Sequence, residues 1–128
     1  MFTCISNKIQ IDVKCEYLVE HSVPRDNFHF HSYTITVINH NHFPVKLLSR
    51  YWRIYDSLSD LREVNGDGVV GKQPTIQPFG RHQYTSACDF AGAIGMMAGH
   101  YVFLNLDSRE VFNAKIPLFI CQANYILN

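Results

Sequence analysis

Two short patterns in the sequence contain residue types that bind ligands. The first is Gly66-Asp67-Gly68-Val69-Val70-Gly71, which matches the spacing G-x-G-x-x-G. In dinucleotide-binding folds these glycines form a tight turn that brings backbone amides close to a pyrophosphate at a helix N-terminus. No helical pattern follows Gly71, because Lys72-Gln73-Pro74 leads into an extended stretch. The motif therefore predicts a β-bulge or loop, with anion binding by its amides beside Lys72 as the weaker alternative.

The second pattern is the repeated His-x-His at His29/His31 and His40/His42. Residues two apart on a strand share a face, so each pair presents two imidazoles on one side, as a metal site requires. No carboxylate or cysteine recurs at a matching spacing, and two histidines alone make a weak site. His29 and His31 also extend the apolar face of the strand that follows, which suits partly buried, hydrogen-bonded imidazoles equally well. They are weak metal-ligand candidates, and His40 and His42 are expected in an exposed turn.

A thiol nucleophile with its base is the remaining catalytic arrangement to test. On one extended strand His82 and Cys88 share a face but are separated by about 20 Å, which is beyond hydrogen-bond reach. The sequence contains no G-x-S-x-G, H-E-x-x-H or paired-carboxylate signature. We therefore predict a protein that is not an enzyme, with no catalytic residues and no cofactor.

The elements that must position these residues are predicted to be strands. Strict alternation of apolar and polar residues covers 9–17 and resumes over 33–37. The run 45–56 is rich in β-branched and aromatic residues and contains Trp52, the only tryptophan, which is expected to anchor the core. Further extended stretches are expected at 84–90, 101–106 and 111–116, with the last two paired across a turn. The segment 61–64 is a short mixture of apolar and charged residues that ends at the glycine loop, and 75–80 is expected to be a strand end with turn chemistry.

The spacing of these runs predicts the fold class. Short strands separated by Pro, Gly and Asn turns are typical of an all-β sandwich of about seven or eight strands. Gly92, Gly95 and Gly99 would each cost about 1 kcal/mol in a helix interior, so 91–101 is not read as a helix. Pro117 is expected to end its strand or to lie at a sheet edge.

Length and composition set the remaining limits. The 128 residues fit one domain spanning 1–128, and 47% hydrophobic residues allow a real core. Eleven basic and eleven acidic residues give a net charge of +0, so neither nucleic acid nor an anionic membrane is expected as a partner. The N-terminus lacks a signal-peptide pattern and no stretch is long enough to span a bilayer, so we expect a cytoplasmic protein. The four widely spaced cysteines are then expected to be reduced.

From residue 44 onward the sequence resembles the ApaG family. The resemblance runs in family order through these segments: Pro44-Val45-x-Leu47-Leu48-Ser49-Arg50-x-Trp52, Glu63-Val64-x-Gly66-x-Gly68-Val69-Val70-Gly71-x-Gln73-Pro74, Ile76-x-Pro78, Tyr84-Thr85-Ser86, Gly95-x-Met97-x-Gly99-x-Tyr101 and Phe112-x-Ala114-x-Ile116-Pro117-x-Phe119. It implies an immunoglobulin-like or fibronectin type III-like β-sandwich. It also implies a family with no established catalytic residue, loosely linked to cobalt resistance and magnesium efflux, whose domain occurs in fusions that suggest a protein-interaction module.

Several positions depart from the family pattern. His29 and His31 stand where relatives usually carry apolar or aromatic residues, so a cation role of the family cannot be assigned to them. Ala87 replaces a usual glycine, and Ala93 lies where proline is common. The loops around 87–95 are therefore expected to be reshaped.

The leading hypothesis is a non-enzymatic interaction module that contacts a protein partner. The candidate patch comprises Ser49, Arg50, Gln73 and Pro74 beside the loop of Gly66, Gly68, Gly71 and Lys72. The alternative is a small-ligand binder, for a divalent cation or a nucleotide pyrophosphate, that uses the glycine loop or the histidine pairs. Exposed edge strands are also compatible with a dimer.

Overall fold

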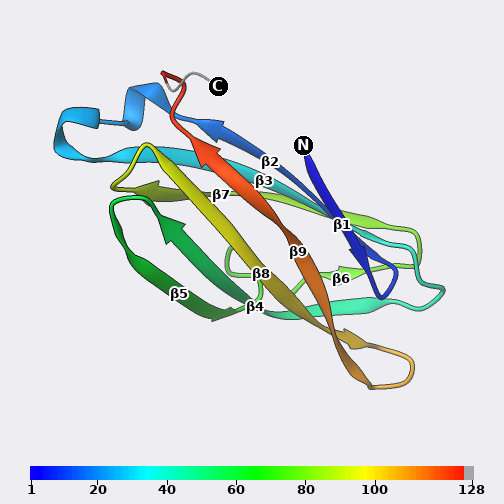
Figure 1. The fold of residues 1–128 in the computed structure, drawn as a ribbon. Coiled ribbons are helices and arrows are strands. Elements are labelled where there is room, and N and C mark those ends of the chain that lie inside the picture. Colours follow the sequence, from blue (N-terminus) through cyan, green and yellow to red (C-terminus); the bar gives the residue numbers. More distant parts are fainter. Residues whose placement is uncertain (126–128) are drawn as a thin grey trace.

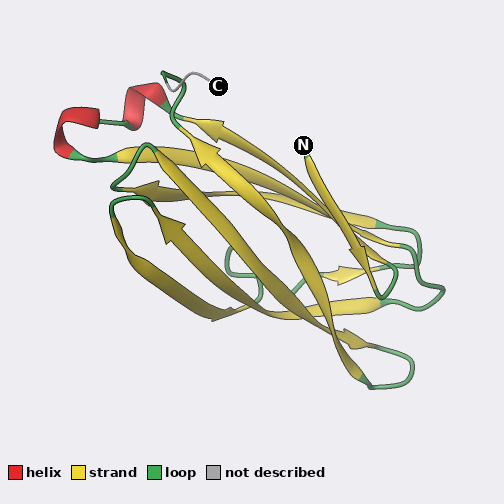
Figure 2. Cartoon of the chain, in the orientation of Figure 1, coloured by secondary structure: helices red, strands yellow, loops and turns green. Residues whose placement is uncertain are grey.

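The computed structural model describes residues 1–125 and contains nine strands and no α-helix within them. Two single-turn 3₁₀ helices, Val19–His21 and Pro24–Asp26, lie between the second and third strands and are the red segments of Figure 2. The strands are β1 (Phe2–Ser6), β2 (Ile9–Tyr17), β3 (His29–Asn39), β4 (Val45–Asp56), β5 (Ser59–Asp67), β6 (Thr75–Ile76), β7 (Arg81–Phe90), β8 (Ile94–Asn105) and β9 (Val111–Gln122) (Figure 1).

The strands form two antiparallel sheets packed face to face. One sheet has the order β1-β2-β3-β7, and the other has the order β5-β4-β8-β9, with β6 paired to β4 (Figure 1). The alternation in the sequence decides which face of each strand is buried: every second residue of β3, from His29 to Asn39, is buried. The prediction of an all-β, immunoglobulin-like or fibronectin type III-like sandwich is confirmed.

The core between the sheets is apolar and rich in aromatic rings. Trp52, 3% exposed, anchors it from β4 as predicted, with its ring centroid 5.6 Å from that of Tyr33 and 5.9 Å from that of Phe119. Tyr101 is fully buried, and its hydroxyl forms a hydrogen bond with the hydroxyl of Tyr84 on the opposite sheet. Burial raises the pKa of Tyr101 and holds it neutral.

The strand count exceeds the predicted seven or eight. The sequence analysis assigned no strand to 2–6, because the two faces of this segment differ little in hydrophobicity. In the structure this segment forms β1 by pairing with β2. The two-residue β6 pairs only with the start of β4. Such strands depend on a neighbour rather than on their own pattern.

Pro117 does not end its strand, because β9 continues to Gln122. The register between β8 and β9 shifts there, since Met97 pairs with Phe119 but Gly99 pairs with Ile116. Proline is tolerated at such a bulge on an edge strand, because its missing amide is not needed by the ladder. Of the two predicted outcomes for Pro117, the edge position is the one observed.

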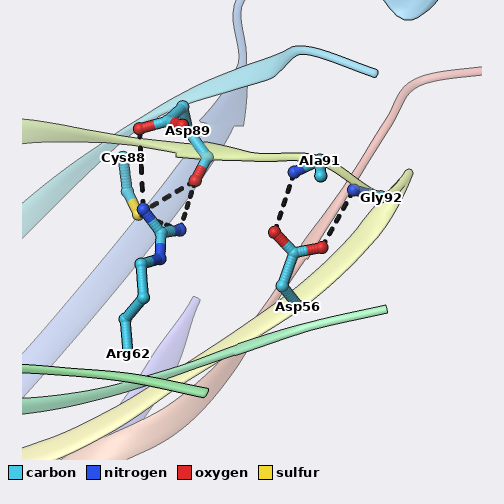
Figure 3. Close-up of polar contacts among 6 residues, drawn as sticks. All are labelled: Asp56, Arg62, Cys88, Asp89, Ala91 and Gly92. Carbon is cyan, nitrogen blue, oxygen red and sulfur yellow. Dashed lines mark hydrogen bonds and ion pairs between the residues drawn. The ribbon is translucent and has the colours of Figure 1, made fainter. Parts of the chain in front are cut away.

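One end of the sandwich is tied together by Asp56, the last residue of β4 (Figure 3). Its carboxylate accepts the backbone amides of Ala91 and Gly92, in the β7–β8 loop, at 2.8 and 2.9 Å, and that of Leu58 at 3.1 Å. Burial alone would raise the pKa of Asp56, but these amide bonds outweigh it and lower the pKa. A Cβ on Gly92 would lie 1.8 Å from the Ser57 Oγ, so a larger residue here would force the Ser57 side chain to move.

The sequence analysis also expected no membrane-spanning stretch and four reduced cysteines. Within the described chain, no helix has the length and apolar character needed to cross a bilayer. All four cysteines are free thiols: Cys88 and Cys121 are buried, and Cys4 and Cys15 are half-buried.

Candidate functional site

The glycine-rich segment forms a tight hairpin directly after β5. Val69 pairs with Lys72 around Val70 and Gly71, which have φ values of +46° and +74°. The two paired backbones exchange hydrogen bonds of 2.7 and 3.0 Å. Two consecutive positive φ values are typical of a two-residue type I′ hairpin. As the sequence predicted, the chain continues from this loop into a strand, β6, and not into a helix.

Gly66 and Gly68 have separate structural reasons for being glycine. A Cβ on Gly68, where φ is +59°, would lie 2.0 Å from the backbone oxygen of Lys72. A Cβ on Gly66 would lie 2.7 Å from the guanidinium of Arg50. That guanidinium donates to the carbonyls of Asp67 and Gly68 at 3.0 and 2.9 Å, so Gly66 makes room for the group that fixes the loop.

Most amides that a phosphate cradle would need already have partners inside the protein. The Gly68 amide donates to the Leu48 carbonyl at 2.8 Å, and the amides of Val69 and Lys72 are used in the hairpin. Anion binding would fall to the amides of Val70 and Gly71 at the tip. Anion contact by the loop of Gly66, Gly68, Gly71 and Lys72 thus stays a prediction.

Replacing glycines of this motif should separate shape from ligand binding. Gly68→Ala is expected to lower the free energy of unfolding by about 2–3 kcal/mol, because the methyl group meets a backbone oxygen at positive φ. Gly71→Ala should cost only about 1 kcal/mol, because nothing lies within 4 Å of its added Cβ. Urea denaturation of both variants measures the difference, and equal losses would contradict this account of the motif.

The structure brings the two halves of the predicted patch together, although they are separated along the chain. β4 has a bulge at Leu48, whose carbonyl accepts the Gln73 side-chain amide at 2.9 Å as well as the Gly68 amide. The Leu47 amide donates to the Pro74 carbonyl at 3.0 Å. Gln73 and Pro74 therefore fasten the loop to β4, and Ser49 and Arg50 follow the bulge directly.

A hollow of about 390 Å³ lies on this part of the molecule, over β4, β5 and β8. Three of the predicted residues line it, together with five that the sequence analysis did not select: Ser49, Arg50, Tyr51, Asn65, Gly66, Asp67, His100 and Val102. Tyr51 pairs with His100 across β4 and β8, and the next pair in the register is the buried Trp52 with Gly99. Tyr51 and His100 therefore lie on the opposite, outer face of the sheet. The alternation of β4 could have identified Tyr51, because a residue next to the buried Trp52 on a strand must face outward.

Contacts around Tyr51 order this face. Its hydroxyl donates to the Glu63 carboxylate at 2.9 Å, which raises the pKa of Tyr51. The Tyr51 ring centroid lies 5.2 Å from the His100 ring centroid, and the Arg53 guanidinium lies over the Tyr51 ring at 5.7 Å from its centroid. These groups can bind a ligand through stacking and hydrogen bonds.

A second hollow, of about 280 Å³, opens between the two sheets. Among the residues lining it are Arg50, Arg62, Tyr33, Ser86 and Cys88. Arg62 reaches from β5 to β7, where it donates to the Asp89 carbonyl and lies 3.7 Å from both the Asp89 carboxylate and the Cys88 sulfur (Figure 3). Sequence analysis missed this bridge, because its ends lie on strands that belong to different sheets.

The Cys88 thiol is a poor nucleophile in this setting. Burial raises the pKa of Cys88 to about 11, although the nearby Arg62 partly opposes this effect. A protonated thiol reacts slowly. His82 lies on the same strand and face, six residues away, as the sequence analysis argued.

His29 and His31 lie on the inner face of β3 and are 3% and 1% exposed. The His29 Nε2 forms a 2.6 Å hydrogen bond with the Tyr125 hydroxyl, and the His31 ring packs edge-on between Tyr17 and Phe90. Among residues 1–125, no cluster of three or more His, Cys, Asp or Glu side chains is placed to hold a metal ion. His40 and His42 are exposed in the turn where they were expected.

Burial of His31 predicts a dependence of stability on pH. Desolvation lowers the pKa of His31 below its ordinary value, and the neighbouring Gln122 backbone only partly opposes this effect. The unfolded chain then takes up a proton near pH 6.5 that the folded chain refuses, so stability falls as the pH drops below about 6.5. The loss ends once the pH reaches the folded-state pKa.

Two variants without the imidazole test this expectation. Urea unfolding of His31→Phe and His31→Gln between pH 7.5 and 5 should show a shallower slope than the wild type, by at most about 1.4 kcal/mol per pH unit. The slope is the readout, so it does not matter that the two variants differ in absolute stability. An unchanged slope in both would place the titrating group elsewhere.

Comparison with known proteins identifies the family. The family model of the ApaG domain matches residues 19–105, which is more than half of the chain. The chain belongs to the ApaG family. Its relatives include Protein ApaG of Shewanella woodyi, 44% identical over 117 residues that cover 91% of this chain and 92% of the relative. Protein ApaG of Bdellovibrio bacteriovorus is 42% identical over 119 residues, covering 93% of each.

Solved structures agree with this assignment. An X-ray structure of a structural genomics target is 40% identical, with a TM-score of 0.87, and the match covers 94% of this chain and 91% of that one. The crystal structure of the putative ApaA protein from Bordetella pertussis is 30% identical with the same TM-score of 0.87, covering 92% and 95%. The ApaG domain match includes every residue of the 390 Å³ hollow but stops before β9.

Proposed function

We propose that this ApaG-family chain is a non-enzymatic interaction module that binds a protein segment on the outer face of β4, β5 and β8. The observation that carries the proposal is the 390 Å³ hollow, because it gathers Ser49, Arg50 and Gly66 of the sequence-predicted patch with Tyr51 and His100. Side chains that contribute most to binding in protein interfaces dock into pockets of this kind.

The composition of the face supports protein binding. Tyr51, Arg53 and Tyr55 alternate along β4, and tyrosine and arginine are the residue types most enriched at the energetic centres of protein interfaces. Tyr51 is already held by Glu63, His100 and Arg53. Because these side chains are ordered before binding, less conformational entropy is lost when a partner docks.

The acidic edge that β5 forms beside the hollow favours a basic segment as the partner, because the Arg50 guanidinium is bound to the carbonyls of Asp67 and Gly68. β5 is an edge strand, and it carries Asp60, Glu63 and Asp67 against the single cation Arg62. The Arg62 guanidinium is turned toward Asp89, which reduces its effect on the outer face. A lysine or arginine of the partner would meet the Asp67 carboxylate at the hollow.

Site-specific photo-crosslinking in cells tests the proposed face. Ser49, Tyr51 and His100 are replaced singly with a photoreactive phenylalanine analogue. Thr34 and Thr85, a hydrogen-bonded pair on the other sheet, serve as matched control positions. We expect one adduct of constant size from the first set and none from the controls. Adducts that form equally from both sets, or none from either, would overturn the proposal.

The crosslinked partner then allows a quantitative test. Tyr51→Ala and His100→Ala should weaken its binding at least tenfold, whereas Thr34→Ala should change it less than twofold. Peptides from the crosslinked segment with their lysines and arginines replaced by glutamine should bind more weakly and lose most of their salt dependence. Equal binding of these peptides would contradict the basic character assigned to the partner.

Binding of a divalent cation or nucleotide, with a role in cobalt or magnesium homeostasis, ranks second. The loop amides are largely used internally, and no third metal ligand joins His29 and His31 in the described residues. Thermal unfolding with magnesium, cobalt, zinc or ATP is expected to leave Tm unchanged. A ligand at a hundred times its Kd would raise Tm by roughly ten degrees, and that result would favour the second function.

A further inference from the structure

Two cysteines from opposite sheets meet at the edge of the core. Cys15 lies on β2 and Cys121 on β9, 106 positions apart in the chain, and their sulfur atoms are 3.1 Å apart. A disulfide bond is about 2.05 Å long, so the sulfurs need to approach by only about 1 Å. β2 and β9 pack against each other, which holds the two thiols in place.

The two thiols differ in access to solvent. Cys121 is 0% exposed and belongs to the core, whereas Cys15 is half-buried at the core margin. A dissolved reagent can therefore reach Cys15 first. Among the described residues, Cys15 and Cys121 are the only two cysteines whose sulfur atoms contact each other.

Their electrostatics are also unequal. The hydrogen bond between the two thiols lowers the pKa of Cys15, in spite of its partial burial, and a hydrogen bond with the Glu16 backbone adds to this effect. The same hydrogen bond and burial raise the pKa of Cys121. Cys15 is thus the more easily ionised thiol, and thiolates are the nucleophiles in disulfide exchange.

We propose that Cys15 and Cys121 form a reversible redox site, in which a small-molecule disulfide oxidises them to a bond that links the two sheets. This site is independent of the proposed partner-binding face, which lies over β4, β5 and β8. It is also outside the segment that matches the ApaG domain, since both cysteines lie beyond 19–105.

The reaction balances as two thiol–disulfide exchanges. The Cys15 thiolate attacks one sulfur of the reagent, RSSR, which forms a mixed disulfide and releases RS⁻. Cys121 then gives its proton to solvent and attacks the Cys15 sulfur, which forms the Cys15–Cys121 bond and releases the second RS⁻. The protein loses two electrons and two protons, and the reagent is reduced to two RSH.

The other two cysteines provide internal controls. Cys88 is buried, its raised pKa keeps it protonated, and its sulfur contacts Arg62 and the Asp89 backbone. Cys4 lies on β1 and is half-buried, so it is reachable by the same reagent. Cys4 can form a mixed disulfide, but the proposal gives it no resolving partner.

The test uses the folded protein in buffers with increasing ratios of oxidised to reduced glutathione. Samples are quenched with acid, denatured, alkylated and analysed by intact mass and peptide mapping. We expect a species that has lost two thiols and gained no glutathione, with one crosslinked peptide that contains Cys15 and Cys121. Excess dithiothreitol should reverse it completely.

Variants distinguish this bond from other oxidation. Cys15→Ala and Cys121→Ala should each abolish the two-thiol loss, and Cys121→Ala should accumulate glutathione on Cys15. Cys4→Ala should behave as the wild type. A persistent mixed disulfide on Cys15 in the wild type, a crosslink to Cys4 or Cys88, or bond formation only after urea unfolding would each overturn the proposal.

A second readout works even where a variant folds poorly. The bond would close a loop of nearly the whole chain and restrict the unfolded state, so oxidised wild-type protein should unfold at a Tm about 10 °C or more above the reduced form. Cys15→Ala should show no oxidant-dependent shift. A wild-type Tm that is unchanged or lowered by the bond would show that the folded geometry does not accommodate it.

Discussion

Trp52→Ala should lower the free energy of unfolding by about 3–5 kcal/mol, because the indole is buried among aromatic rings of the core. Trp52 is 3% exposed and its indole contacts rings from both sheets, namely Tyr33 of β3, Tyr101 of β8 and Phe119 of β9. Its removal leaves a cavity where the sheets meet, and strands of a hydrogen-bonded sandwich cannot collapse far to fill it.

The measurement is urea denaturation followed by far-ultraviolet circular dichroism, because Trp52 is the only tryptophan and the variant loses its intrinsic fluorescence probe. Domains of this size are stable by about 5–15 kcal/mol, so the variant should sit near the unfolding threshold. Tyr51→Ala is the matched control: it removes the adjacent ring from the outward face and should cost about 1 kcal/mol or less. Similar losses at both positions would mean that the core is not centred on Trp52.

The alternation of apolar and polar residues was sufficient to predict the fold class and most strands. β2, β3 and β4 each bury one face, so their period of two is visible in the sequence. β1 gave no such signal, because it is short and is held by its hairpin with β2, and β6 gave only a strand end, because its partner on β4 lies far back along the chain. For Pro117 the sequence left two outcomes open, and the edge position is observed because the bulge opposite Ala98 lets the strand continue.

The candidate site was predictable only in part. Ser49, Arg50 and Gly66 were selected from the sequence, and the structure brings them to one hollow. His100 was missed, because its place beside Tyr51 depends on the register between β4 and β8, which no local pattern specifies. The contact of Cys15 with Cys121 joins residues 106 positions apart in different sheets, so no local pattern in the sequence could have predicted it either.

The glycine motif shows how context decides the meaning of a short pattern. In a βαβ unit the same spacing would present amides to a pyrophosphate. Here Gly66 accommodates the Arg50 guanidinium and Gly68 approaches the Lys72 carbonyl, and a strand follows. The absence of a helical pattern after Gly71 was therefore more informative than the glycines themselves.

Gly99→Ala is the second large effect that we expect, with a loss of about 3 kcal/mol in the free energy of unfolding. Gly99 pairs with Trp52 in the register of β4 and β8, beside the bulge at Pro117. An added Cβ would lie 1.9 Å from the Tyr51 carbonyl oxygen and 3.2 Å from the Trp52 Cα. Both obstacles are backbone atoms of an adjacent strand, so no side chain can rotate away to relieve the clash.

The variant must therefore move β8 away from β4, which weakens their hydrogen bonds and shifts Trp52. Urea denaturation gives the stability, and the intensity and wavelength of Trp52 fluorescence in the folded protein report the local displacement. Gly80→Ala is the control with the same chemical change, because its added Cβ meets its nearest atom, the Gln77 oxygen, at 3.1 Å and should cost less than about 1 kcal/mol. A Gly99→Ala protein with wild-type stability and unchanged fluorescence would contradict the close approach of β4 and β8 at this point, and with it the register that places Tyr51 beside His100.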